Sequence, residues 1–135
     1  MSGPGNYNQI LIEQYRANGG KTSFPLPLLL LTTTGAKSGQ PRTTPVAYSR
    51  DGDRYIIIAS KGGAPTHPDW YHNLLAHPLV SIEVGGETFQ ARATVAEGAE
   101  WERLYEQHGA EMPGFLEYRK KTSRHIPVII LERVA

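Results

Sequence analysis

Two apolar runs joined by a glycine-rich basic loop constrain the fold of this chain more than any other feature. Residues 28–34 and 54–60 are nearly all apolar or β-branched, which is the pattern of buried strands. Residues 43–50 predict a more polar strand between them, and the dipeptide Asp51-Gly52 predicts the hairpin turn that follows it. The centre of the chain is therefore expected to be a set of sequential antiparallel strands.

Basic residues follow both apolar runs. Lys37 and Arg42 come after the first run and Lys61 after the second, so we expect two cationic loops to meet at one place. Residues 1–63 hold seven basic and three acidic residues, whereas residues 64–135 hold seven and ten. The net charge of +1 excludes a general nucleic-acid binder, and the cationic first half favours a small anionic ligand.

The remaining chain alternates between predicted helices and strands. Helices are expected over residues 7–16, 68–77 and 97–108, a less regular, partly helical stretch over 112–124, and strands over 79–84, 89–95 and 126–134. Hairpins with segregated helices predict an α+β fold in which about six mainly antiparallel strands curl into a small barrel. We expect residues 1–23 to form an amphipathic helix and a linker, and residues 24–135 the barrel domain.

Two predicted helices have an apolar face at helical spacing. In the first helix this face consists of Tyr7, Ile10, Leu11 and Tyr15. In the helix over residues 97–108 it consists of Trp101, Leu104, Tyr105 and His108. The first helix is expected to cover the barrel, and weak peripheral membrane contact through it is left open.

Length and composition restrict the class of protein further. The 135 residues suit one domain, and the lack of cysteine excludes disulfides and thiolate chemistry. There is no signal-peptide pattern, and no apolar run approaches the ~20 residues that span a bilayer. A cytoplasmic location is the expectation that follows.

Several familiar chemistries are not supported by the motifs. The sequence around Lys37 and Ser38 lacks the glycine spacing and following helix of a phosphate-binding P-loop. His67, His72 and His77 lie five residues apart, so they spread around a helix and do not predict a metal site. No serine-hydrolase motif or close pair of catalytic carboxylates is evident.

From the residues alone, the remaining hypothesis is a loop that binds an anion. Glycine in a turn after a strand exposes backbone N–H groups, and Lys37, Ser38 and Arg42 add cationic and hydroxyl donors. Trp70 and Tyr71 at a helix start would suit the rings of a planar, anionic ligand. A plain hairpin turn is the alternative for the loop, and packing in the core is the alternative for the aromatic residues. No protein-based acid–base mechanism is visible, which favours a cofactor.

Three long segments then resemble one family. TTTGAKSGQPRTTPVAY, IIASKGGAPTHPDWYHNLLAHPLVSIEV and RHIPVIIL are similar to the deazaflavin-dependent nitroreductase family, which consists of flavin and deazaflavin oxidoreductases with a split β-barrel fold. The resemblance covers residues 28–131. It implies coenzyme F420 as the cofactor and hydride transfer from the reduced deazaflavin to an electron-poor acceptor. Quinones, activated enones and nitroaromatics are the acceptors implied.

The resemblance also implies a set of cofactor-binding residues. These are Ala36, Lys37, Ser38, Arg42, Thr43, Thr44, Pro45, Val46, Ala47, Ile58, Ala59, Ser60, Lys61, Asp69, Trp70, Tyr71, His72 and Asn73. Residues 36–42 would hold the phosphate and oligoglutamate tail, and residues 43–47 and 58–61 would line the ring. Residues 69–73 would close the site with backbone amides at a helix N-terminus.

Two catalytic residues and an acceptor pocket are implied in the same way. Ser60 would lie near the reactive edge of the ring, with Tyr118 as the second catalytic residue. The acceptor pocket would consist of Ala47, Tyr48, Met112, Phe115 and Tyr118. Ala47, Met112 and Phe115 stand where the nitroreductase itself has tyrosines. We therefore expect weak nitroreduction, with quinone or enone reduction left open.

Other functions and assemblies are left open by the sequence. The same barrel could bind F420 as a carrier without turnover, or it could use FMN or haem. The basic residues suit a long oligoglutamate tail better than a single FMN phosphate. The expected partner is a small-molecule acceptor, and the chain is expected to be a monomer or a homodimer.

Overall fold

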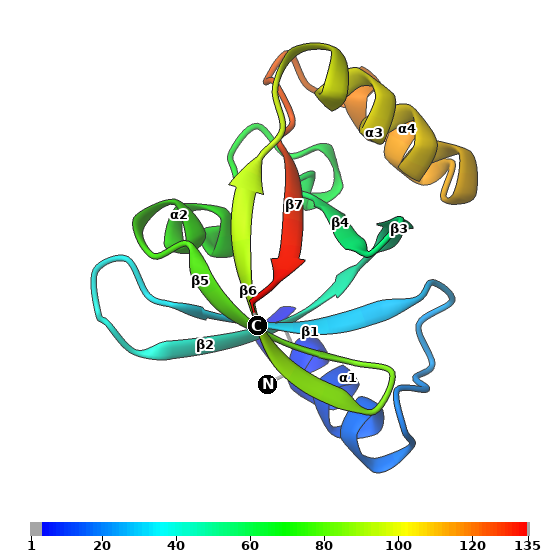
Figure 1. Cartoon of the computed structure of the whole chain (residues 1–135). Coiled ribbons are helices and arrows are strands. Elements are labelled where there is room, and N and C mark those ends of the chain that lie inside the picture. The colour runs from blue at the N-terminus through cyan, green and yellow to red at the C-terminus, as the bar shows by residue number, and fades with distance from the viewer. Residues whose placement is uncertain (1–3, 135) are drawn as a thin grey trace.

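The fold is a curled antiparallel sheet surrounded by helices, as Figure 1 shows for this computed structural model, which describes residues 4–134. The strands are β1 (Leu28–Thr34), β2 (Pro41–Ala47), β3 (Ser49–Asp51), β4 (Arg54–Ile58), β5 (Leu79–Val84), β6 (Glu87–Val95) and β7 (Val128–Arg133). The helices are α1 (Pro4–Ala17), α2 (Asp69–Ala76), α3 (Gly98–Glu111) and α4 (Gly114–Lys121), with a 3₁₀ turn, η1, over Lys61–Gly63. None of the helices in this described part is long and apolar enough to cross a membrane.

The seven strands form one half-barrel in the order β2-β1-β5-β6-β7-β4-β3. Every neighbouring pair is antiparallel: β1 pairs with β2 through Leu31 and Thr44, and β4 pairs with β7 through Ile57 and Ile129. The predicted α+β class and split-barrel architecture are confirmed.

The expected strand over residues 43–50 is wrong in one respect, because the structure divides it into β2 and β3. Ala47 still pairs with Leu28 of β1, but the amide of Tyr48 donates to the carbonyl oxygen of Pro27 at 3.2 Å. Ser49 then pairs with Ile56 of β4. At Tyr48 the chain therefore passes from one edge of the sheet to the other, which curls the sheet and gives seven strands instead of six.

Side chains on the two faces of each strand enter different cores, as the alternation of a pleated strand requires. Leu29 and Leu31 of β1 lie in the barrel interior together with Leu74 of α2. Leu28 and Leu30 point to the outer face, where they pack under α1. A third cluster joins the outer face of β4 and β7 to α3 and α4. The helices are thus held by burial of apolar strand faces.

The helix predictions were partly right. Leu104, Tyr105 and His108 of α3 are buried and Trp101 is half-buried, which confirms the predicted face. In α1, Leu11, Ile12 and Tyr15 are buried, but Tyr7 and Ile10 are 47% and 44% exposed. The predicted face of α1 was therefore wrong over its first turns. Leu11, Ile12 and Tyr15, in the later turns of the helix, pack against Leu28 and Leu30.

Candidate functional site

A cavity of about 1210 Å³ lies where α1, the β1–β2 loop, β2 and the start of α2 meet. We call it the polar cavity. Ten of the predicted cofactor-binding residues line it: Ala36, Lys37, Ser38, Arg42, Thr43, Thr44, Asp69, Trp70, His72 and Asn73. Segments more than 30 positions apart in the sequence are thus brought together at one site.

The side chain of Asn73 holds the two halves of this cavity together. Its Oδ1 accepts a hydrogen bond of 2.9 Å from the Ala36 amide, and its Nδ2 donates one of 3.1 Å to Thr33 Oγ1. Asn73 is 8% exposed, so these bonds satisfy a buried amide and fix the β1–β2 loop against α2. The sequence pointed to the amides of this helix start, but the side-chain role of Asn73 was missed.

The loop itself depends on a glycine. A Cβ atom on Gly35 would lie 2.4 Å from Ser38 Oγ, so a larger residue would displace the hydroxyl. The Gly35 amide donates to the Gln40 carbonyl oxygen at 2.8 Å, and the Gly39 amide to the Gly35 carbonyl oxygen at 2.9 Å. The turn therefore brings Lys37 and Ser38 back toward α2.

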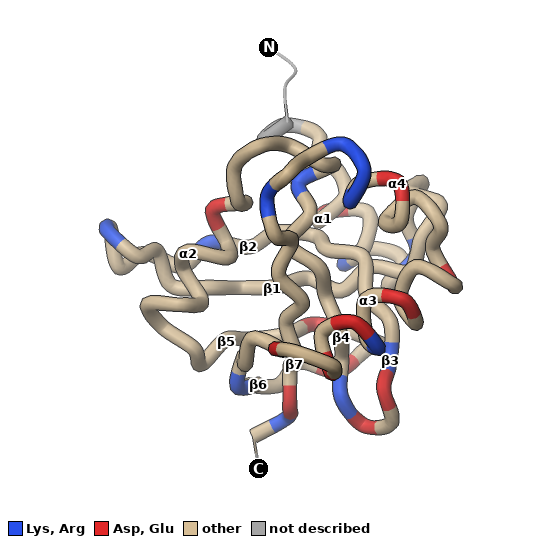
Figure 2. The backbone as a smooth tube through the Cα atoms, turned by 90° about the horizontal axis from the view of Figure 1, so that it is seen from above, with Lys and Arg blue, Asp and Glu red and all other residues tan. Residues whose placement is uncertain are grey.

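Positive charge dominates the loop of this cavity. Lys37 and Arg42 are exposed, and neither makes an ion pair with a residue that the structure describes. The tip of the β1–β2 loop is the basic segment at the left of Figure 2. Arg16 of α1 also lines the cavity, where it donates to Glu83 at 2.7 Å. The sequence did not suggest Arg16 as a cavity residue, because its position beside the cavity depends on how α1 packs against the sheet.

Of the residues predicted to line the ring, only Thr43 and Thr44 line this cavity, and Pro45, Val46, Ala47 and residues 58–61 do not. Ile58 and Ala59 are buried, and Ser60 is 6% exposed. Lys61 Nζ donates to Thr66 Oγ1 at 3.3 Å, so Lys61 does not line the polar cavity with Lys37 and Arg42. Of the three cations expected to meet at one place, Lys37 and Arg42 line this cavity and Lys61 does not. Of the other residues predicted to line the ring, Val46 is buried in the barrel and Pro45 is half-buried, as is Tyr71 of the segment predicted to close the site.

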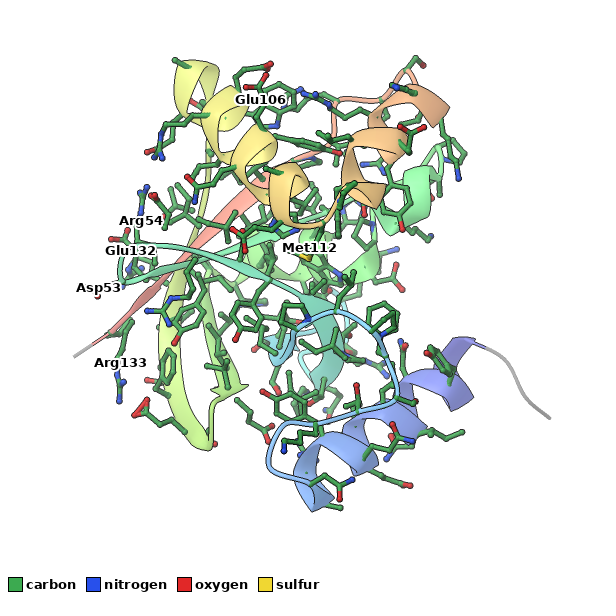
Figure 3. The ribbon with its side chains drawn as sticks, turned by 90° about the vertical axis from the view of Figure 1, so that its right-hand side faces the viewer. Asp53, Arg54, Glu106, Met112, Glu132 and Arg133 are labelled. Atoms are coloured by element: carbon green, nitrogen blue, oxygen red, sulfur yellow. The ribbon has the colours of Figure 1, made fainter. Side chains whose placement is uncertain are left out.

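Four of the five predicted acceptor-pocket residues lie together. Met112 and Phe115 are buried, 3% and 8% exposed, and Ala47 and Tyr118 pack against the same core. We call these four residues the apolar cluster. Figure 3 shows Met112 between the α3–α4 pair and the sheet, whereas Glu106 lies on the outer side of α3.

Tyr48 does not belong to the apolar cluster. Its ring packs with the barrel-interior core, 5.6 Å from the ring of Tyr55. Ala47 and Tyr48 are neighbours in the chain at the β2–β3 junction, so their side chains enter different cores. The structure thus contradicts the placement of Tyr48 beside Ala47, Met112 and Phe115.

A buried histidine supports the apolar cluster. His108 is fully buried, and its ring meets that of Phe115 edge-on at 4.5 Å. Its Nδ1 lies 2.7 Å from Ser49 Oγ, and its Nε2 has no hydrogen-bond partner among the described residues. Burial lowers the pKa of His108 to about 4, so the ring is neutral at pH 7.

Tyr105 fixes the start of α4 beneath the same cluster. Its hydroxyl donates to the Phe115 carbonyl oxygen at 2.6 Å, and burial raises its pKa to about 12. Tyr105 and His108 were predicted only as members of a helix face. Their contacts with Phe115 depend on the crossing of α3 and α4, which the sequence did not specify.

The fold is of the split-barrel type, and its chemistry is given by the family to which the chain belongs. The family model described as F420H(2)-dependent quinone reductase matches residues 8–133, and the chain belongs to this family. The chain is therefore an F420-dependent reductase, which confirms the predicted class of enzyme and its cofactor.

Individual relatives agree with this family. The chain is 44% identical over 128 residues to an F420H(2)-dependent quinone reductase of Mycobacterium tuberculosis, with 88% of this chain and 85% of the relative covered. A solved F420-H2 dependent reductase, FDR-A, is 42% identical and has a TM-score of 0.73, with 78% of this chain and 94% of that chain covered. A domain-swapped dimer is 36% identical with a TM-score of 0.75, covering 96% and 100%.

The residues of the polar cavity fit the cofactor of this family. F420 has a phosphate and an oligoglutamate tail, and Lys37 and Arg42 are cations without carboxylate partners in the described chain. Ser38 and the start of α2 add neutral donors to the same cavity. A polyanionic tail would therefore find complementary charge here.

Proposed function

We propose that this chain reduces quinones with a hydride from reduced F420, with the cofactor tail in the polar cavity. The observation that supports this most is the convergence of Lys37, Arg42 and the start of α2 on one cavity through the side chain of Asn73. Charge-assisted hydrogen bonds to phosphate and carboxylate groups would supply most of the binding free energy.

The deazaflavin ring would lie against the segment after β4. When bound, the reduced ring supplies the hydride, and the protein orients the ring and the acceptor and excludes water. The hydroxyl of Ser60 makes no hydrogen bond to any described residue, so it is free to donate to or accept from a ligand. In this proposal Ser60 holds the reactive side of the ring.

The apolar cluster would receive the acceptor. Its side chains are a methyl, a thioether, a phenyl ring and a single phenol, that of Tyr118. Such a surface suits the flat, apolar body of a quinone, and Tyr118 could donate one hydrogen bond to an acceptor oxygen. A nitro group would find fewer donors, so we expect nitroaromatics to be poor substrates.

Binding and turnover are tested together by titrating the purified protein with F420 and, separately, with FMN. Ring fluorescence reports binding, and the reduced deazaflavin is then mixed with menadione, an enone or a nitroaromatic. F420 binding with menadione reduction is the expected result. F420 binding without any turnover would indicate a carrier, and tight FMN binding without an F420 response would overturn the proposal.

Assembly and membrane contact are further parts of the proposal. A homodimer is supported by the solved domain-swapped dimer, which this chain matches over 96% of its length. Weak peripheral membrane contact would use the exposed Tyr7 and Ile10 of α1. Light scattering after size-exclusion chromatography measures the mass in solution, and co-sedimentation with anionic vesicles measures membrane binding. A monomeric mass or the absence of co-sedimentation would contradict the respective part.

A further inference from the structure

Arg124 has an unusual set of partners for a half-buried arginine. Its guanidinium donates to three backbone carbonyl oxygens: Nη1 to Ala59 at 3.1 Å, Nη2 to Ser60 at 2.8 Å, and Nε to Ala64 at 3.1 Å. Nη1 also lies 2.7 Å from Nδ1 of His67. No carboxylate of the described chain forms an ion pair with it. The charge of Arg124 is therefore directed entirely at the segment 59–67.

These bonds determine where two backbone amides point. A trans peptide group has its N–H and C=O on opposite sides, and the described chain has no cis peptide. Because the carbonyl oxygens of Ala59 and Ser60 face Arg124, the amides of Ser60 and Lys61 face away from it. Neither amide donates to a backbone carbonyl oxygen of the described residues. Two successive N–H donors are thus left free on the side opposite the guanidinium.

The backbone conformation is consistent with such a donor pair. Ser60 has φ −80° and ψ −36°, and Lys61 follows with φ 48°, so a right-handed residue precedes a left-handed one. This succession turns consecutive amides toward a common point and forms a concave site for an anion or a carbonyl oxygen. A left-handed conformation is costly for lysine, and the bonds from Arg124 to both sides of the turn hold it in place.

Arg124 also connects this loop to α2. Arginine can only donate, so Nδ1 of His67 must accept, and the proton of the neutral imidazole is on Nε2. The His67 ring packs 4.7 Å from Tyr71 and 5.8 Å from His72. Burial, then the charges of Arg124, His72 and His125, lower the pKa of His67. The same guanidinium thus orients the loop after β4 and the helix that lines the polar cavity.

We propose that Arg124 is a positioning residue that presents the amides of Ser60 and Lys61 as a paired donor for the electron-rich carbonyl edge of the deazaflavin ring. This inference rests on the proposed function, which places the ring at this loop. Donors that are already oriented stabilise negative charge on the ring without reorganisation at the moment of transfer. The positive charge at the carbonyl ends of both peptide groups makes their N–H groups stronger donors.

The experiment compares the wild-type chain with Arg124→Met, Arg124→Lys and the matched control Arg119→Met. Arg119 is also on the α4 side of the molecule, but its guanidinium stacks on Tyr105 at 4.5 Å and does not contact the loop. Amide resonances of Ser60 and Lys61 are followed by NMR with and without oxidised F420, and fluorescence gives the affinity. The tautomer of His67 is read from its ring ¹⁵N shifts in the protein without cofactor.

In the wild type, F420 is expected to move the Ser60 and Lys61 amide protons downfield, with Nδ1 of His67 unprotonated. Arg124→Met should abolish these shifts and weaken F420 binding about 10-fold, and Arg124→Lys should restore part of the affinity because it keeps the charge but not the planar fork. Arg119→Met should match the wild type. F420 binding by the wild type without those amide shifts would overturn this inference alone, even if Arg124→Met failed to fold. No F420 binding by the wild type would overturn the proposed function with it.

Discussion

The polar cavity and the apolar cluster are built on the same sheet but offer opposite chemistry to a ligand. In the polar cavity the cations Lys37 and Arg42 are exposed, and the polar side chain behind them, Asn73, has both its donor and its acceptor satisfied. In the apolar cluster Met112 and Phe115 are buried, and the polar atom behind them, His108 Nε2, is unsatisfied. One region thus offers exposed positive charge, and the other offers apolar side chains that are buried from water.

Under the proposed function, this difference would separate cofactor binding from the choice of acceptor. Exposed cations can attract and hold a polyanionic tail without any rearrangement of the core, whereas an acceptor at Phe115 must displace or slide past buried side chains. Changes in the polar cavity should therefore act mainly on cofactor affinity. Changes in the apolar cluster should act on acceptor choice and on the stability of the fold.

Removing Lys37 and Arg42, which have no ion-pair partner among residues 4–134, should have the largest effect. Each charge-assisted hydrogen bond contributes about 1.5–3 kcal/mol, so Lys37→Gln combined with Arg42→Gln should weaken F420 binding about 1000-fold. Fluorescence titration at two salt concentrations measures this, and the salt dependence should become shallower. Lys120→Gln is the control, because Lys120 is 74% exposed and pairs with Glu117 away from the cavity. Equal losses in both variants would mean that net charge, and not the cavity, determines binding.

The next effect concerns acid stability in the apolar region. His108 has a folded pKa of about 4 against an ordinary value of 6.5. The unfolded chain therefore binds the proton first as the pH falls, and stability that is complete above pH 6.5 is lost progressively down to pH 4. The difference between these two pKa values corresponds to a loss of about 3 kcal/mol in the free energy of unfolding.

Urea unfolding at several pH values measures this loss. The slope of unfolding free energy against pH reports how many protons the chain takes up on unfolding. Between pH 4 and 6.5, His108→Gln should lower this number by one, whatever the variant does to stability at pH 7. His77→Gln, which removes an exposed imidazole, is the matched control. An unchanged slope in His108→Gln would show that this ring does not become charged on unfolding.

Asn73 tests the link on which the polar cavity depends. Asn73→Ala leaves the Ala36 amide and the Thr33 hydroxyl without their partner, and an unsatisfied buried group costs about 1–3 kcal/mol. We expect about 2 kcal/mol lower stability in urea and weaker F420 binding. Asn18→Ala also removes a side-chain hydrogen bond, but that residue is exposed at the end of α1, so its loss should be small. Unchanged F420 affinity in Asn73→Ala would show that F420 binding does not depend on the position of the β1–β2 loop that Asn73 fixes.

Period and composition were enough to predict most of the elements, because buried strands and amphipathic helices have regular apolar spacing. The seven buried residues of LLLL in β1 and III in β4 needed only their apolar character to be assigned to strands. The cationic loop and α2 were assigned to one site by resemblance, and ten of their residues do share a cavity.

What the sequence could not predict depends on contacts between distant elements. The strand is interrupted at Tyr48, whose amide donates to the Pro27 carbonyl oxygen. The Tyr48 side chain packs in the barrel interior as a consequence of this interruption. The positions of Arg16 beside the cavity and of Arg124 behind Ser60 depend on how helices and loops pack. The local sequence pattern holds no information on contacts between distant elements. In the sequence, Arg16 and Arg124 therefore looked like ordinary surface cations.

A smaller effect is expected at the turn between β3 and β4, remote from both regions. Asp51 accepts hydrogen bonds from Arg103, at 3.2 Å from its Nη1, and from Arg54, and these bonds lower the pKa of Asp51 from 3.8 to about 2. This stability is complete above pH 3.8 and is lost as the pH falls through 2. Since the carboxylate is partly exposed, Asp51→Asn should cost only about 1 kcal/mol at pH 7.

Asp53 provides the control for this turn. It lies at the same edge of the molecule, where Figure 3 shows it with Arg54, Glu132 and Arg133, but it makes no ion pair with a described residue. Thermal unfolding of Asp51→Asn and Asp53→Asn gives the difference. Equal shifts in Tm would mean that the Arg103 pairing, which ties α3 to the turn, contributes nothing to stability.

The smallest change is the sharpest test of the apolar cluster as the acceptor site. Phe115→Tyr adds one hydroxyl donor. One hydrogen bond contributes about 1 kcal/mol at most to the preference for a nitroaromatic over a quinone, so kcat/KM for a nitroaromatic should rise several-fold. The value of kcat/KM for menadione should stay within about twofold of the wild-type value. Phe89→Tyr makes the same change in the barrel interior, under Arg133, and should alter neither substrate. If nitroaromatic turnover did not rise in Phe115→Tyr, or rose equally in Phe89→Tyr, the acceptor would not be bound beside Phe115, and only the polar cavity would retain its proposed role.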